Sequence, residues 1–239
     1  QNYYRFYQDN NQLTPNDPWP PEGTPLGENT SITELDRPLR TGDIARVRIS
    51  LQVANANMPA SFSQYRLQFA ERTTTCTGAS GWSDVGTAAS STIWRGYAAT
   101  GTTDGTALSS DPPLAGDLLL SVADVAGTLE HENPSAPNPY AVFDGEDIEY
   151  DWYLEQNGAP PRTTYCFRMV ENDGTPLDGY FNYPQLETAG FTPLVSNWRW
   201  YGDPDNETPT NPLAAETVAP SGVANDSRLA LRVALDEVA

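Results

Sequence analysis

The chain has 239 residues, of which 32 are acidic and 13 basic, giving a formal net charge of −19, and every basic residue is an arginine. So negative a surface repels phosphates and anionic headgroups, which argues against nucleic-acid and simple membrane-surface binding, and without lysine neither Schiff-base chemistry nor a P-loop is available. No apolar run reaches the roughly 18 residues that a membrane span needs, so no span is predicted.

Alternation of apolar and polar residues is the dominant pattern and predicts strands. In residues 45–53, ARVRISLQV, the odd-numbered residues from Val47 onward are apolar and the even-numbered ones, such as Arg46 and Arg48, are polar. This alternation predicts a strand with one buried and one solvated face. The same pattern predicts strands at 65–69, 92–97, 148–154, 164–170 and 179–186.

Turn signals separate these strands. The run ENDG at 171–174 predicts a hairpin with a type I′ turn, because Asp173 and Gly174 tolerate positive φ angles. Residues 121–132 carry a weak helical pattern, while 18 glycines and 21 prolines punctuate almost every window. We therefore expect an all-β sandwich or barrel with long loops.

Cys76 and Cys166 are the only cysteines. Free buried thiols are one interpretation, but an even count and a secreted character favour a structural disulfide. The strand TTYCFRMV, followed by DG and an aromatic strand, resembles the penultimate strand of an immunoglobulin or fibronectin-type sandwich, which implies a disulfide between the two sheets. Tyr165 is adjacent to Cys166, which departs from the usual Tyr-x-Cys spacing of that family.

The chain begins and ends with the same pattern. NWRWYGDPDNETPTNP at 197–212 matches the N-terminal segment at an offset of 194 residues, with Arg5 on Arg199. After a ten-residue deletion, VRISL at 47–51 aligns with LRVAL at 231–235 in the same alternation. We predict a disulfide-stapled sandwich over residues 1–190 and, over 191–239, a truncated second repeat of its first two strands.

Three interpretations of the second repeat remain open. It folds back onto the preceding domain at a domain boundary, or it adds a layer to one enlarged sandwich. Alternatively, it completes the sheet of a neighbouring subunit by strand addition, which builds an open filament unless the rotation closes.

Several strings resemble the repeated β-sandwich units of large secreted surface proteins from uncultivated environmental bacteria. They include WRGY, ENPSAPNP and the segment 151–186, DWYLEQNGAPPRTTYCFRMVENDGTPLDGYFNYPQL, which is the most specific. The resemblance implies a structural or adhesive role at the cell surface, and it supplies no catalytic residues.

The predicted assembly interface is formed by aromatic and apolar residues of the repeated strands. These are Tyr4, Phe6, Tyr7, Trp198, Trp200, Tyr201, Leu229, Leu231 and Val233. Aromatic residues on both faces of a strand suit an interface or a sugar-stacking platform, and interfaces are the commoner use.

Candidate chemistry is sparse. His131 is the only histidine and no GxSxG motif accompanies it, so we expect a solvated loop residue instead of a catalytic base, and one histidine does not make a zinc site. Asp203, Asp205 and Glu207 have the alternating carboxylate spacing of a calcium loop. They form the candidate metal site, and no other cofactor is expected.

These features predict a secreted protein of the extracellular space or cell surface. The first residue is Gln1 instead of methionine, which is expected where a signal peptide has been removed. The predicted role of the protein is structural: a self-assembling, pilus-like surface filament subunit joined by β-strand addition, with copies of itself as partners. The alternative is a surface adhesin or carbohydrate-binding module with glycan partners. We do not expect an enzyme.

Overall fold

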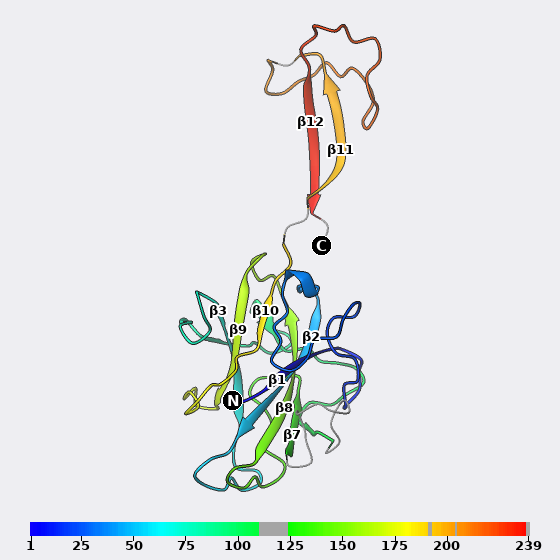
Figure 1. The fold of residues 1–239 in the computed structure, drawn as a ribbon. Coiled ribbons are helices and arrows are strands. Elements are labelled where there is room, and N and C mark those ends of the chain that lie inside the picture. The colour runs from blue at the N-terminus through cyan, green and yellow to red at the C-terminus, as the bar shows by residue number, and fades with distance from the viewer. Residues whose placement is uncertain (110–123, 191–192, 204, 238–239) are drawn as a thin grey trace. The chain divides into compact units, whose positions relative to one another are not determined.

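The structure is a computed structural model that describes residues 1–109, 124–190, 193–203 and 205–237 (Figure 1). The chain divides into two compact units, Gln1–Gly190 and Phe191–Ala239. Strands dominate the described residues, and the helical element found there is a short 3-10 turn, Glu34–Asp36. Within the described part of the chain, no helix has the length and hydrophobicity needed to cross a bilayer.

Unit 1 contains a six-stranded sheet in the order β1-β2-β8-β7-β6, with β5 also paired to β8. Its strands are β1 (Tyr4–Gln8), β2 (Ile44–Gln52), β5 (Trp94–Arg95), β6 (Thr106–Ala107), β7 (Val125–Glu130) and β8 (Asp147–Gln156). All neighbours are antiparallel except β7 and β8, which are parallel.

A second, four-stranded antiparallel sheet has the order β10-β9-β3-β4. Its strands are β3 (Tyr65–Glu71), β4 (Ser83–Asp84), β9 (Thr164–Glu171) and β10 (Gln185–Glu187). Side chains of β1, β2 and β8, including Ile49 and Trp152, share one apolar core with side chains of β3 and β9, including Leu67 and Phe167. Two sheets enclosing a common core are the arrangement of a β-sandwich.

Each predicted strand coincides at least in part with an observed strand, but three local predictions are corrected. Residues 125–130, within the weakly helical segment 121–132, form β7, and the part of that segment before Asp124 lies outside the described residues. In the turn ENDG only Gly174 has a positive φ, +89°, so the turn is not type I′. The strand predicted at 179–186 is reduced to β10.

The second face of β2 is buried, which corrects the prediction of a solvated face. Arg46 is 0% exposed because the loop after β1 folds over it, and its guanidinium donates to the carbonyl oxygens of Gln12 and Leu13. Asp151 of β8 accepts a 2.6 Å ion pair from Arg46 and a 3.3 Å ion pair from Arg48. Burial alone would lower the pKa of Arg46, but the Asp151 carboxylate raises it above its ordinary value. Glu149 of β8 lies 3.8 Å from Arg48, so two carboxylates far away in sequence balance the two buried arginines.

Unit 2 contains a two-stranded antiparallel sheet of β11 (Pro193–Tyr201) and β12 (Ala230–Glu237). A β-bulge lies between Val195 and Asn197, after which the strands pair without interruption to Tyr201. A long loop connects the two strands, as a long loop connects β1 to β2 in unit 1.

Candidate functional site

The hairpin of unit 2 pairs in the register of the first hairpin of unit 1. In unit 1, Tyr4 pairs with Ile49, Arg5 with Arg48 and Phe6 with Val47. At the aligned positions of unit 2, Trp198 pairs with Val233, Arg199 with Arg232 and Trp200 with Leu231. Cross-strand partners lie on the same face of a sheet. The two hairpins therefore present aligned side chains on aligned faces.

The loops return to their first strands through matching hydrogen bonds. In unit 1 the amide of Trp19 donates to the Phe6 carbonyl at 3.0 Å, and in unit 2 the amide of Leu213 donates to the Trp200 carbonyl at 3.0 Å. The arginines at the aligned positions also match: Arg5 Nε donates to Leu26 O at 3.0 Å and Arg199 Nε donates to Ala214 O at 2.9 Å.

A third correspondence concerns the backbone. Asn29 and Thr217 have φ angles of 54° and 60°, and their amides donate to the carbonyl oxygens of Tyr4 and Trp198. Few residues other than glycine adopt this left-handed conformation, and it is unusual for a β-branched residue such as threonine. A shared positive φ at these two places indicates that the two loops follow the same path there.

The apolar faces of the two hairpins differ in exposure. In unit 1 the face of β1 and β2 lies in the sandwich core, and Val47 and Ile49 are 0% exposed. Their counterparts in unit 2, Leu231 and Val233, are 47% and 44% exposed, and Leu235 is 58% exposed. Trp198 and Trp200 share this face and are half-buried. The hairpin of unit 2 thus carries core-type side chains that the described residues leave largely uncovered.

The sheet edges differ as well. In unit 1, β2 lies between β1 and β8 and pairs with β8 along its whole length from Ile44 to Gln52. In unit 2, β12 pairs with β11 alone among the strands that the structure describes. One edge of β12 therefore presents unpaired backbone groups, which is the feature that accepts an added strand.

The predicted interface residues separate into two groups. Tyr4, Phe6 and Tyr7 are at most 2% exposed inside unit 1, so they form no surface there, because the second sheet and the loop after β1 cover them. In unit 2, Trp198, Trp200, Leu231 and Val233 share the apolar face. Tyr201 alternates onto the opposite face, and Leu229 precedes β12 and is half-buried.

The predicted calcium loop does not gather its carboxylates. The side chain of Asp203 accepts hydrogen bonds from the amides of Thr210 and Asn211, which lower its pKa, while Asp205 and Glu207 are exposed. Among the described residues no three histidine, cysteine or acidic side chains are placed to hold a metal ion. Asp203 closes a turn because the nearby backbone amides satisfy its oxygens.

His131 is buried instead of solvated. It is 5% exposed, its ring packs edge-on against Tyr153, and its Nε2 lies 2.8 Å from the Thr102 hydroxyl. Burial, assisted by the charge of Arg46, lowers its pKa, although Asp104 opposes the shift. These contacts make His131 a packed structural residue.

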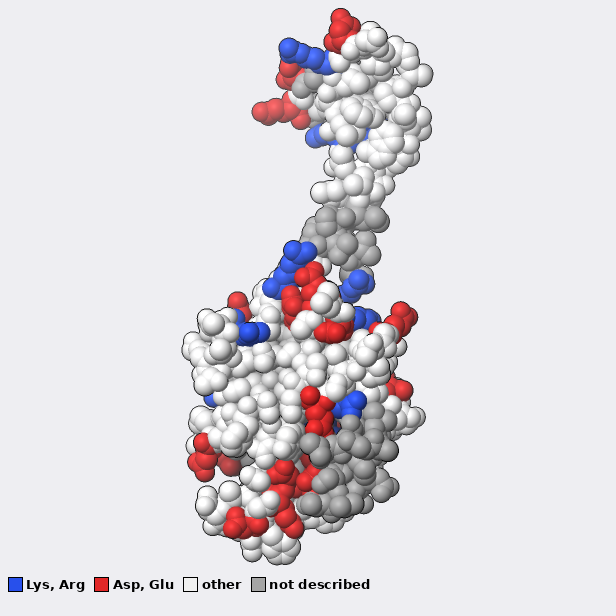
Figure 2. Space-filling model, viewed as in Figure 1, with Lys and Arg blue, Asp and Glu red and all other residues white. Residues whose placement is uncertain are grey.

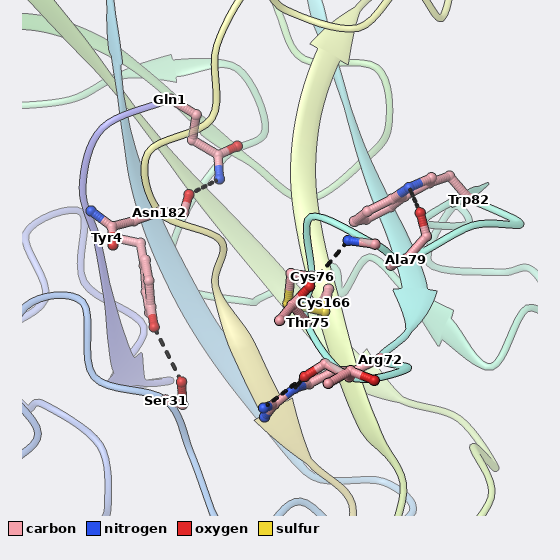
Figure 3. Close-up of a disulfide and its surroundings, with 12 residues drawn as sticks. Gln1, Tyr4, Ser31, Arg72, Thr75, Cys76, Ala79, Trp82, Cys166 and Asn182 are labelled. Atoms are coloured by element: carbon pink, nitrogen blue, oxygen red, sulfur yellow. Dashed lines mark hydrogen bonds between the residues drawn. A yellow bond between two sulfur atoms is a disulfide. The ribbon is translucent and has the colours of Figure 1, made fainter.

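The disulfide between Cys76 and Cys166 is confirmed, but it does not connect the two sheets. Cys166 lies on β9 between Tyr165 and Phe167, both of which face the core, so the cysteine faces outward. Cys76 belongs to the loop that follows β3, the strand paired with β9 in the same sheet. The bond therefore fastens this loop onto the outer face of the four-stranded sheet, as Figure 3 shows.

Beside the disulfide, the same outer face carries an aromatic cluster that was not predicted from the sequence. Trp82 stacks on Tyr183, Tyr183 stacks on Tyr180, and the Arg168 guanidinium lies 4.3 Å from the centre of the Trp82 ring. The adjacent Phe181 is 80% exposed and lines a hollow of about 280 Å³. The three aromatic residues within residues 180–183, YFNY, are the pattern in the sequence that could have indicated this cluster.

The visible face of the molecule shows no concentrated charge patch. On the view drawn in Figure 2, acidic side chains are scattered over unit 1, while most of the visible surface of unit 2 is uncharged. The chain matches no protein-family model, no curated protein and no solved structure. Function is accordingly inferred from geometry.

Proposed function

We propose that the chain is an extracellular structural protein, a self-assembling subunit of a cell-surface filament whose members join by β-strand addition at unit 2. The observation that carries the proposal is the hairpin β11–β12, which has the register and loop bonds of β1–β2 but an uncovered apolar face. We interpret this hairpin as the beginning of a second immunoglobulin-like unit.

An isolated two-stranded hairpin is marginally stable in water, because it buries too little apolar surface to offset the entropy of ordering its chain. Leu231, Val233 and Leu235 are each about half exposed, and covering a leucine or valine side chain fully contributes about 1.5 to 3 kcal/mol. A partner that covers this face therefore stabilises unit 2 as well as joining two subunits.

Three other sheet edges are covered, which favours addition at β12. In unit 1 the outer edge of β1 is capped by the chain's own loop, through bonds such as Gln8 N to Asp17 O at 2.9 Å. The outer edge of β10 is bridged by Ile32 and Leu39. In unit 2 the loop caps β11 in the same way, through Gly202 N to Asn211 O. Covered edges resist indiscriminate pairing, so growth at one edge would be directional.

The surroundings of the site fit an extracellular setting. The disulfide suits an oxidising compartment, and a net charge of −19 favours solubility outside the cell. The resemblance to repeated surface-protein units supports the same assignment. Nothing in the proposed role requires a catalytic residue.

The experiment compares the full chain with two single variants by light scattering and negative-stain microscopy over a range of concentrations. We expect the wild type to form fibres. Val233→Asp, which places a charge on the apolar face, should weaken association by about a hundredfold, equivalent to about 3 kcal/mol. The matched control Asn197→Asp places the same charge on the opposite face, on β11 and away from the accepting edge of β12, and should assemble. A wild type that stays monomeric at all concentrations would overturn the proposal.

The aromatic cluster beside the disulfide favours one second candidate, a carbohydrate-binding surface. Phe181 is exposed, and the polar side chains of Asn182 and Gln185 line the same hollow. Flat rings next to amide groups are suited to pyranose stacking. Binding of the monomer to a glycan array that is lost in Phe181→Ala and kept in Phe62→Ala, which removes another exposed phenylalanine, would support this candidate.

A further inference from the structure

The proposed strand addition raises a question of chemistry: which strand does β12 accept? The β2–β8 pair in unit 1 provides the template, since β12 occupies the place of β2. In that pair Val47 is opposite Trp152, Arg48 opposite Asp151 and Ile49 opposite Tyr150. The aromatic residues of β8 enter the core, and the carboxylate of Asp151 faces the arginine on the other side.

Transferred to unit 2, the template places Leu231, Arg232 and Val233 opposite the three residues of the incoming strand. Arg232 occupies the position of Arg48, but no described residue stands in for Asp151 beside it. Arg48 is 1% exposed and lies 3.3 Å from the Asp151 carboxylate. Arg232 is exposed, and within the described residues it has neither an ion pair nor a side-chain hydrogen bond.

The other arginine of the hairpin is already satisfied. Arg199 donates to the Ala214 carbonyl, just as Arg5 donates to the Leu26 carbonyl. Unit 2 thus reproduces the interactions that unit 1 makes within its own hairpin, and it lacks those that unit 1 makes with β8. Among the described residues, the elements of unit 1 without a counterpart in unit 2 are one strand, one carboxylate and the apolar side chains on either side of that carboxylate.

We propose that β12 accepts β8 of a second copy of this chain, running antiparallel, with Asp151 of that copy facing Arg232 and with Tyr150 and Trp152 covering Val233 and Leu231. This inference rests on the proposed function and identifies the strand that joins the subunits. Tyr-Asp-Trp occurs once in the sequence, at 150–152. Contact between the end of one chain and the body of the next is heterologous, as open growth requires.

In the second copy β8 is paired with β2 along nine positions, so β11–β12 reaches it by taking the place of β1–β2. On the apolar face the exchange is conservative, because Trp198 and Trp200 stand where Tyr4 and Phe6 stood. On the other face Ala230 takes the place of Arg46, so Arg232 alone of the two arginines is replaced in kind. The exchange covers the apolar face of β11–β12 while it uncovers that of β1–β2, so the total buried apolar area changes little. Joining is therefore expected to be slow, to depend on concentration and to accelerate in urea concentrations that loosen unit 1 without unfolding it.

The test uses a synthetic peptide of residues 147–156, DIEYDWYLEQ, as an uncovered copy of β8. The peptide carries a fluorophore and is titrated into the full chain. We expect saturable binding, slower hydrogen exchange at residues 230–235 and inhibition of fibre growth. An Asp151→Arg peptide should bind at least tenfold more weakly, and an Arg232→Asp chain should restore its binding. Because the first substitution lies in the peptide, the fold of the chain is unchanged.

The outcomes separate the two proposals. If fibres form but the peptide neither binds nor inhibits, or if a peptide of scrambled order binds equally well, the choice of β8 is wrong while strand addition stands. If the peptide binds with the expected charge reversal but the chain never assembles, β12 accepts a β8-type strand and the filament proposal fails. If neither occurs, both are overturned.

Discussion

Glu130 at the end of β7 is expected to make the protein less stable as the pH rises from about 5 to 8. Its side chain is 0% exposed, and burial raises its pKa from 4.5 to about 8, an effect to which Asp104 adds. Hydrogen bonds from the Thr128 hydroxyl and the Ala136 amide favour the charged form and offset part of the shift.

The sign follows from the protons bound in each state. Between about pH 4.5 and 8 the folded chain keeps a proton on Glu130 that the unfolded chain releases, so raising the pH favours unfolding. The stabilisation is complete below about pH 4.5 and is lost as the pH passes 8. A shift of about 3.5 units at about 1.36 kcal/mol per unit sets an upper limit of about 5 kcal/mol.

The perturbation is Glu130→Gln, which keeps an acceptor for the Ala136 amide but does not titrate. Urea unfolding of the wild type and the variant, followed by circular dichroism from pH 5 to pH 9, gives the difference in unfolding free energy. We expect the unfolding free energy of the wild type, relative to that of the variant, to fall by several kcal/mol as the pH rises. An exposed-site control, Glu71→Gln, should show no such trend. A flat difference curve for Glu130→Gln would refute the reasoning.

Three further variants test other parts of the fold by urea unfolding at constant pH. Replacing Cys76 and Cys166 by serine opens a loop of about 90 residues and should destabilise unit 1 by up to about 4 to 5 kcal/mol; no change in midpoint would show that the loop contributes little. Asp151→Asn removes the carboxylate that pairs with Arg46 and leaves Arg48 only Glu149 at 3.8 Å, so it should cost about 3 to 5 kcal/mol; an unchanged stability would mean that water reaches the arginines. Gly127→Ala drives a methyl group into the backbone carbonyl of Glu149 and should cost about 1 to 3 kcal/mol, unless β7 shifts freely.

Local alternation predicted the core side of the sandwich but not its second buried layer. Val47 and Ile49 are buried as their pattern indicates. The neighbouring Arg46 and Arg48 follow the same alternation and would be solvated if charge alone decided. They are buried because Asp151, more than 100 positions away in sequence, supplies the opposite charge, and such a partner leaves no trace within the strand itself.

The disulfide shows the same division between local and distant information. The even number of cysteines, the secreted character and the sequence around Cys166 predicted the bond between Cys76 and Cys166. That the bond fastens a loop to its own sheet became clear only once β3 was seen to pair with β9, with Ala70 opposite Cys166 and Cys76 in the loop after β3. The aromatic cluster around Trp82 was missed for a similar reason, because its rings come from loops that meet only in the folded chain.

In the second hairpin, the geometry that the repeated sequence specifies by itself can be separated from the burial that depends on neighbouring strands. Register, the loop bond of Arg199 and the left-handed Thr217 all follow from residues within the hairpin, and they recur without a core beneath them. The threonine adopts a backbone conformation that costs such a residue about 1 kcal/mol or more, so the loop path is imposed by its bonds and not by local preference. Burial of Leu231 and Val233 requires strands that the hairpin does not contain. Under the proposed strand addition, a hairpin that retains its internal geometry while the described residues leave its apolar face open is the element that accepts the strand.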